Sequence, residues 1–368
     1  MLYLLLRFMH YIKKNIYTII KIVLAFVIIF SFIYFYDDIM PNNPIVIVSS
    51  EKTIVTSVLE QNIDPSKNYI YSSTMQIAWN KLTNEYFKET IEIEDKPQYV
   101  DKLNEHLNES PNVSEDSYTA LLSINDNDAL KKINIDLAKR FNSNLITPIN
   151  SNGIVAYSSI YKEFSFKNKF ESFKSKFKFS SNEIEIKSFG IEKYDDTEYQ
   201  KKLADQIFVH YYDHDKPGHK YFIFELKTNS LEDSIIISNF KPEETLLKSF
   251  EFINSKIINN KDKEQYGVDS LVVPKMNFNV IHRYYDLINK KIKNKKHNEL
   301  SISDAISNIN FKIDESGIKF SSFFEMILLA NSPRLNVNGP FIIYLIDKKS
   351  KTPYFMAYIG NDELLLKK

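Results

Sequence analysis

Three histidines and two aspartates gather within ten residues and form the clearest candidate for metal chemistry. The stretch reads His210-Tyr-Tyr-Asp213-His214-Asp215-Lys-Pro-Gly-His219. Imidazole and carboxylate groups suit zinc, copper or nickel. The Pro-Gly pair predicts a turn between two strands, across which His210 and His219 could meet. Solvated turn residues explain the same pattern, so we expect no metal and no cofactor. His210, His214 and His219 are the ligand candidates if that expectation fails.

No nucleophile or acid–base pair stands in a diagnostic catalytic motif. The sequence contains neither GxSxG nor HExxH, and it lacks the GxGxxG and GxxxxGK[ST] motifs of nucleotide-binding folds. The carboxylates of Glu92, Glu94 and Asp95 are expected to be solvated charges, as are those of Asp195 and Asp196. We therefore predict that the protein is not an enzyme.

Composition narrows the function classes further. The 368 residues include no cysteine, which excludes disulfides, thiolate metal sites and cysteine nucleophiles. Lys plus Arg and Asp plus Glu both number 47, and this balance argues against a nucleic-acid partner. A hydrophobic fraction of 43% predicts a folded chain with a sizeable core.

An apolar segment near the amino terminus has the length of a membrane span. Residues 16–36 carry one charge, at Lys21, and a helix of about 20 apolar residues crosses a bilayer. Basic residues precede the segment and acidic residues follow it, namely Arg7, Lys13, Lys14, Asp37 and Asp38. The positive-inside rule then predicts a cytoplasmic amino terminus and a main domain outside the cytoplasm.

These features divide the chain into four parts. We predict a basic cytoplasmic amino terminus over 1–15, a single transmembrane anchor over 16–36, a linker over 37–44 and one large domain over 45–368. A cleaved signal peptide is the alternative to an uncleaved signal-anchor. The bulky residues that end the segment, Tyr34-Phe35-Tyr36, disfavour cleavage because a signal peptidase requires small residues.

Helical and strand patterns follow one another along the domain. Apolar residues recur at helical spacing over 74–86 and 130–141, and Pro242 is expected to open a helix that runs to Ile258. Strand-like runs are 69–71, 154–161, 184–189, 206–212, 220–226, 271–279, 310–314, 341–346 and 354–359. Helices dominate the first part and strands the second, which predicts an α+β domain with more than one sheet.

Six blocks of the chain resemble the serpin family in their order. Gly339–Asp347 resembles the serpin [KR]-P-F strand, and Thr352–Ile359 resembles its final partner strand, with the family's spacing between them. The other blocks are Asn68–Ser72, Tyr161-Lys162 with Phe166 and Phe170, Leu271–Met276, and Phe311–Gly317. The resemblance covers residues 45–366. It implies a serpin-like fold, with a central, mostly antiparallel sheet, further sheets and surrounding helices.

The resemblance also implies a hinge that begins at Gly317 and leads into a reactive-centre loop. In this family the cleaved loop inserts into the central sheet, which needs small side chains at alternate hinge positions. The inward set here is Ile318, Phe320, Ser322 and Phe324, of which three are bulky. Overpacking costs about 1–3 kcal/mol per site. We therefore expect insertion to be severely slowed.

The reactive-centre-like loop spans residues 318–338 by this resemblance. Counting from its two ends places a would-be scissile bond within Leu329, Ala330 and Asn331. Leu329 would suit a chymotrypsin-like or elastase-like protease, and Arg334 offers a basic alternative.

Two shutter positions of the family also differ, because Ser307 stands where a histidine is usual and Tyr157 where an asparagine is usual. We predict a membrane-anchored, extracytoplasmic serpin-fold protein that does not trap proteases and acts as a binding or structural module. It would meet the membrane through 16–36 and a protein partner or protease at the loop 318–338. The alternative is a serine-type endopeptidase inhibitor with an atypical hinge and loop.

Overall fold

The structure is a computed structural model in which Ile45–Lys368 form one compact unit, and Met1–Pro44 group separately. The described residues are 44–48, 50–107, 113–124, 126–140, 154–173, 177–180, 184–195, 197–213, 220–260, 267–317, 333–350 and 352–368. The predicted anchor over 16–36 lies outside these ranges. Within them, no helix combines the length and the apolar composition that a bilayer crossing requires.

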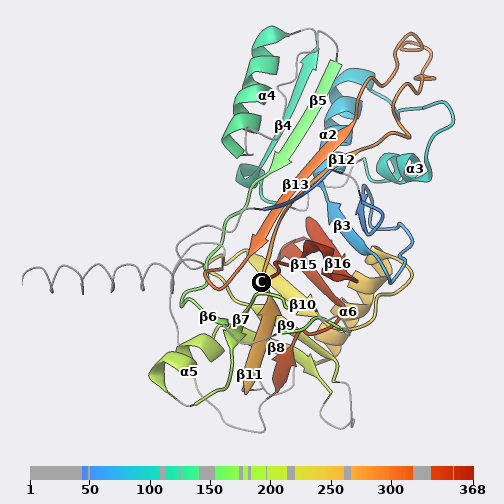
Figure 1. Cartoon of the computed structure of the whole chain (residues 1–368). Helices are drawn as coiled ribbons and strands as arrows, with labels where there is room; N and C mark the ends of the chain where they lie inside the picture. The colour runs from blue at the N-terminus through green and yellow to red at the C-terminus, as the bar shows by residue number, and fades with distance from the viewer. Residues whose placement is uncertain are drawn as a thin grey trace, which may run out of the picture. The chain divides into compact units, whose positions relative to one another are not determined.

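The largest sheet has seven strands in the order β2-β3-β16-β15-β10-β9-β8. Its strands are β2 Thr53–Thr56, β3 Asn68–Ser72, β16 Phe355–Ile359, β15 Phe341–Asp347, β10 Asp233–Ser238, β9 Phe222–Leu226 and β8 Ile207–Tyr212. All neighbours pair antiparallel except β2 and β3, which pair parallel. The two strands that carry the carboxy-terminal resemblance, β15 and β16, lie next to each other in this sheet (Figure 1).

Three smaller sheets complete the described β-structure. The first has the order β1-β12-β13, with β1 Ile45–Ile47, β12 Met276–Arg283 and β13 Ile306–Ile313. The second has the order β14-β11-β7-β6, with β14 Arg334–Asn336, β11 Ser270–Pro274, β7 Ser188–Ile191 and β6 Glu171–Phe173. The third pairs β4 Tyr118–Ile124 with β5 Ile154–Ile160.

Five α-helices and three shorter helical segments accompany the sheets in the described part of the chain. The helices are α2 Thr74–Leu82, α3 Gln98–Glu105, α4 Asn127–Arg140, α5 Glu198–Ala204 and α6 Leu246–Asn260. The shorter segments are η1 Thr83–Phe87, η2 Glu115–Ser117 and η3 Asp362–Leu364. Helix α2 contacts both β4 and β5, and α4 contacts β4 (Figure 1).

Helix α6 begins later than the sequence suggested. Pro242 was the expected start, but Thr245 provides the cap, because its hydroxyl accepts a hydrogen bond from Lys248 N at 3.1 Å. Its carbonyl also accepts one from Ser249 N at 3.0 Å. A side chain that satisfies a free amide of the first turn defines a helix start more strongly than a nearby proline does.

The seven-stranded sheet is buried on both faces, which explains its almost continuous apolar strands. On β15, Ile343 and Leu345 join the main core, whereas Ile342 and Tyr344 face the cluster formed with α6. Phe250 of α6 packs edge-on against Tyr344, with ring centroids 5.3 Å apart. Helix α6 therefore covers one face of this sheet (Figure 1).

Strands β5 and β13 belong to separate sheets in the described part of the chain. In the described residues, β12 and β13 belong to one sheet and β4 and β5 to another, and no ladder joins β5 to β13. The sheets are mixed, with antiparallel pairs in the majority, and the parallel pairs outside the seven-stranded sheet are β1 with β12 and β14 with β11. Pairing between distant strands depends on tertiary contacts that local patterns do not encode.

Candidate functional site

The base of the predicted hinge is a tight turn directly after β13. Gly317 N donates to Asp314 O at 3.1 Å, and Asp314 Oδ1 accepts from Ser316 N at 2.9 Å. Gly317 has a φ of 78°, and a Cβ added there would lie 2.2 Å from Phe166 N. Only glycine fits this conformation and this approach of backbone to backbone.

Glu315 ties the hinge base to two other strands through lysine contacts. Its carboxylate lies 2.5 Å from Lys275 Nζ, between β11 and β12, and 3.5 Å from Lys169 Nζ. Lys275 Nζ also donates to Ser172 Oγ of β6 at 2.7 Å. Burial acts to raise the pKa of Glu315, but the hydrogen bond and charge of Lys275 outweigh burial and lower this pKa below its usual value.

The segment after β5 holds the hinge base through its backbone. Phe166 N donates to Ser316 O at 3.2 Å, and Phe170 N donates to Glu315 O at 2.8 Å. The two phenyl rings pack edge to face with centroids 4.9 Å apart, and both are buried. The polar turn is therefore fixed against an aromatic part of the core.

Most of the predicted hinge and loop residues lie outside the described part of the chain. They are Ile318, Phe320, Ser322, Phe324, Leu329, Ala330 and Asn331, and the same holds for His214 and His219. Gly317, Arg334 and His210 are the predicted site residues that the structure describes. Residues 318–332 lie outside the described part of the chain, so the prediction about hinge side-chain size stays a prediction.

Arg334 belongs to a strand rather than to an extended loop. It begins β14, which pairs parallel with β11, and its Nε donates to Asp269 Oδ2 at 2.8 Å. The next residue, Leu335, is fully buried. The predicted loop 318–338 is thus shortened at its far end, because alternating burial anchors residues 334–336 in the sheet.

His210 lies on β8 and faces a carboxylate of the neighbouring strand β9. Its Nε2 is 3.3 Å from Glu225 Oε2 across the β8–β9 pair, and Ser234 Oγ donates to the other Glu225 oxygen at 2.9 Å. Burial raises the pKa of Glu225, but hydrogen bonds from His210 and Ser234 outweigh it, so the pKa falls. No group of three or more metal-ligating side chains occurs among the described residues.

Ser307 and Tyr157, the two positions at which the sequence resemblance implies other residues, both have hydrogen-bonding partners. Ser307 stands opposite His282 in the β12–β13 ladder, and its hydroxyl lies 3.2 Å from the Tyr284 hydroxyl. Tyr157 donates to Asp136 Oδ2 of α4 at 2.8 Å. Both contacts join residues far apart in sequence, so the sequence patterns carried no signal for them.

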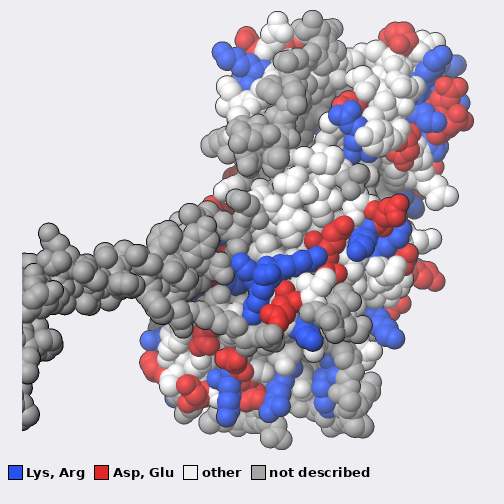
Figure 2. Space-filling model, viewed as in Figure 1, with Lys and Arg blue, Asp and Glu red and all other residues white. Residues whose placement is uncertain are grey.

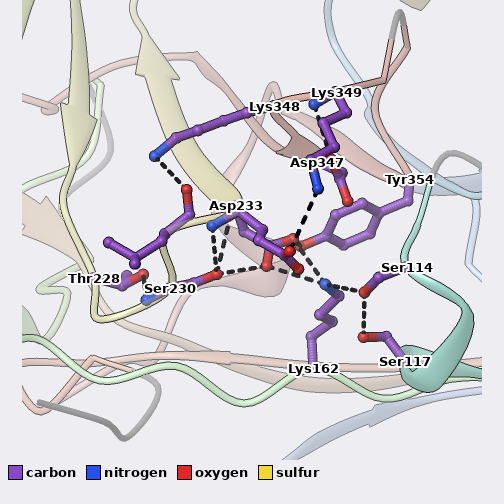
Figure 3. A network of polar contacts seen from close by, with 12 residues as sticks. Ser114, Ser117, Lys162, Thr228, Ser230, Asp233, Asp347, Lys348, Lys349 and Tyr354 are labelled. Carbon is purple, nitrogen blue, oxygen red and sulfur yellow. Dashed lines mark hydrogen bonds and ion pairs between the residues drawn. The ribbon is translucent and has the colours of Figure 1, made fainter.

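A buried ion pair links the end of β5 to the start of β10 (Figure 3). Lys162 Nζ lies 2.9 Å and 3.0 Å from the two carboxylate oxygens of Asp233, and both side chains are nearly inaccessible. Ser230 Oγ donates to Asp233 Oδ2 at 2.7 Å and the Tyr354 hydroxyl to Oδ1 at 3.1 Å. Lys162 Nζ also donates to Ser114 Oγ at 3.1 Å.

The hydroxyl groups near Lys162 do not form a nucleophile–base pair. Ser114 Oγ lies 2.8 Å from Ser117 Oγ, a chain that ends on Lys162. A lysine bound by both oxygens of a carboxylate is an ammonium group, which donates protons to hydrogen bonds and cannot act as a base. Burial, and next the charge of Asp233, raise the pKa of Tyr354 well above its usual value, so this hydroxyl stays protonated.

Charged side chains are mixed by sign on the face of the molecule shown in Figure 2. Lys and Arg alternate with Asp and Glu among the described residues of that face, as expected from equal numbers of both. A broad basic surface for nucleic acid is not seen there.

The sequence resemblance contained half of the polar network. Lys162 and Lys275 each belong to a block that resembles the serpin family, but no sequence pattern indicates that they pair with Asp233 and Glu315. A lysine flanked by aromatic residues, as Tyr161 and Phe164 flank Lys162, is a weak sign of a buried cation that needs a carboxylate.

Solved structures with this arrangement of elements are serpins. The fold is similar to that of protease nexin-1, solved with heparin, at 12% identity and a TM-score of 0.50, covering 81% of this chain and 93% of that chain. Serpin48 of the insect Tenebrio molitor matches at 14% identity and a TM-score of 0.48, covering 80% and 92%. Human thyroxine-binding globulin matches at 12% and 0.48, covering 81% and 92%.

No protein-family model and no curated protein matches the sequence. At 12% identity the similarity to protease nexin-1 shows the fold alone. The serpin-like α+β fold predicted from the six sequence blocks is therefore confirmed, while activity and partners have to be inferred from this chain's own residues.

Proposed function

We propose that the protein is a membrane-tethered serpin-fold module that binds a partner outside the cytoplasm and does not trap proteases. The observation that carries this proposal is the size of the residues after Gly317. Ile318, Phe320 and Phe324 occupy three of the four alternate positions that would have to enter a packed sheet. Each bulky side chain costs about 1–3 kcal/mol where the interior has no room for it.

The way the hinge base is held supports the same proposal. Glu315 has two lysine contacts, and the backbone of the turn accepts hydrogen bonds from Phe166 and Phe170. Gly317 admits no side chain beside Phe166. A loop that inserts must rearrange this turn, so every contact that stabilises it opposes insertion.

The tether rests on the apolar segment 16–36 and its charge asymmetry. The partner would bind at the apolar stretch that follows the hinge, where Phe323, Phe324 and Met326 succeed one another. An apolar stretch of this kind in a loop ordinarily packs on the protein itself or binds another surface.

Incubation of the full chain with a panel of serine proteases tests the proposal. We expect cleavage or no reaction, but no protease–protein complex that survives SDS. A stable covalent complex with any protease of the panel would overturn the non-inhibitory function. Heat-denatured protease serves as the control for non-specific association.

The second candidate function is inhibition of a serine-type endopeptidase, and one observation favours it. No ladder joins β5 to β13 in the described residues, so both strands have a side on which a further strand could pair. If the loop inserts there, cleavage within 325–335 should raise the melting temperature strongly. Cleavage that leaves the melting temperature unchanged eliminates this candidate.

A further inference from the structure

One end of the β4–β5 ladder lies next to Lys162. Tyr118 and Ile160 form the first pair of the ladder, and Tyr161 N donates to Ser117 O at 3.0 Å just beyond it. Lys162 then reaches Asp233 at the start of β10 in the seven-stranded sheet. This end of the ladder is therefore joined to another sheet by a buried ion pair (Figure 3).

The same segment continues from the ion pair to the hinge base. Between Lys162 and Phe170 there are eight peptide bonds, and Phe166 and Phe170 donate backbone hydrogen bonds to Ser316 and Glu315. Residues 162–170 thus include the lysine of the ion pair and the two residues whose backbone binds the hinge base.

The ion pair is costly to break because its groups are out of water. The side chains of Lys162 and Asp233 are 10% and 4% exposed. Removing one member leaves the other charge buried without a counterion, which destabilises far more than loss of a surface pair. Tyr354 and Ser230 add two hydrogen bonds to the carboxylate, so it is also held in one orientation.

The far end of the ladder is held differently. Its last pair is Ile124 with Ile154, and Ile124 is 44% exposed. Between the two ends, β5 is fixed laterally by hydrogen bonds from Tyr157 and Ser159 to Asp136 of α4. The buried ion pair is the contact that joins the Ile160 end of this ladder to the seven-stranded sheet.

We propose that the Lys162–Asp233 ion pair is a pin that fixes both the near end of β4–β5 and the hinge base to the seven-stranded sheet. This inference goes beyond the proposed function, and the pin would hold whether or not the loop can trap a protease.

Hydrogen exchange followed by mass spectrometry on the full chain in detergent micelles tests the pin. The variant is Asp233→Asn, and the matched control is Glu232→Gln, the same chemical change at the neighbouring exposed residue, whose contact is a surface pair with Lys349 at 3.6 Å. We expect Asp233→Asn to speed exchange at least about tenfold in peptides that cover 113–124 and 154–173. Peptides that cover β7 and β11 should keep their rates.

Three results decide the inference. Faster exchange in 113–124 and 154–173, with unchanged rates in β7 and β11, supports it, and unchanged exchange in 113–124 and 154–173 overturns it. A rise of equal size in every sheet also overturns it, because the ion pair would then stabilise the domain as a whole. If Asp233→Asn does not fold, Tyr354→Phe removes one hydrogen bond to the carboxylate and keeps the ring, and the same pattern is expected with a smaller rise.

Discussion

Single residues fix the base of the loop through both backbone and charge. Gly317 supplies a conformation with positive φ, and Glu315 supplies a carboxylate for Lys275 and Lys169. The glycine was predicted from the sequence resemblance as the start of the hinge. The lysine partners were not, because Lys275 stands forty positions before Glu315 and Lys169 stands still further away.

Gly317→Ala is expected to destabilise the protein by at least about 1–3 kcal/mol, because the new side chain has an unfavourable φ and would overlap the backbone of Phe166. Chemical denaturation followed by tryptophan fluorescence measures the loss. Gly339→Ala is the control, since a Cβ there meets nothing within 4 Å. Equal stability of the two variants would contradict this account of the hinge.

Glu315→Gln is expected to destabilise at neutral pH and to matter less in acid. The pKa of Glu315 is lowered on folding, so its contribution to stability is present above the unfolded-state value of 4.5. That contribution is lost as the pH falls through the lower, folded-state pKa. Urea midpoints at pH 7 and near pH 3 measure the effect, and the gap between wild type and variant should narrow in acid.

Glu94→Gln serves as the control for the acid experiment, because Glu94 is exposed. Its substitution should leave the midpoint unchanged at both pH values. A gap between wild type and Glu315→Gln that widens in acid would show that the carboxylate is not stabilised by Lys275.

At the scale of elements, strong local patterns predict the positions of individual helices and strands. They do not predict which strands pair with one another. Helix α2 and strands β5, β8, β9, β15 and β16 lie close to the predicted positions. The predicted strand over 271–279 divides at Lys275 into β11 and β12, which belong to different sheets. Periodicity reports burial of a local face, whereas the sheet to which a strand belongs depends on packing between distant segments.

Asp136→Asn should loosen α4 from β5, because the carboxylate accepts hydrogen bonds from both Tyr157 and Ser159, the latter at 2.7 Å. Hydrogen bonds to a charged group contribute about 1.5–3 kcal/mol. Exchange in peptides that cover 127–140 should therefore become roughly tenfold faster or more. Lys132→Gln, on the exposed side of the same helix, should leave exchange unchanged. Equal rates in both variants would show that Asp136 does not hold the helix.

At the scale of the whole molecule, the order of six short blocks predicts the fold, which is confirmed, whereas the predicted function stays a prediction. The order of the six blocks is informative because a fold determines the order in which its strands occur along the chain. The blocks contain buried residues such as Lys275 and Phe341. Proteins that share a fold but differ in activity can have such residues in common. The residues that would separate inhibition from binding follow Gly317, outside the described part of the chain.

The proposed membrane tether leads to a prediction for how the whole chain behaves on extraction. The full chain should remain with the membrane pellet after an alkaline carbonate wash, because a span of about 20 apolar residues inserts stably. A variant that lacks residues 1–36 should be released into the supernatant. Release of the full chain by carbonate would show that residues 16–36 do not form an anchor.

Strand β1 has a mechanical consequence for a tethered protein. It joins the domain through three residue pairs with β12, from Ile45 beside Phe278 to Ile47 beside Val280. Tension applied from the amino-terminal side reaches the folded unit at these pairs before any other strand. In a single-molecule pulling experiment we expect β1 to detach first, as a small early extension, while the rest of the domain stays folded. A single unfolding event that includes β1 would show that this short ladder resists force as strongly as the core does.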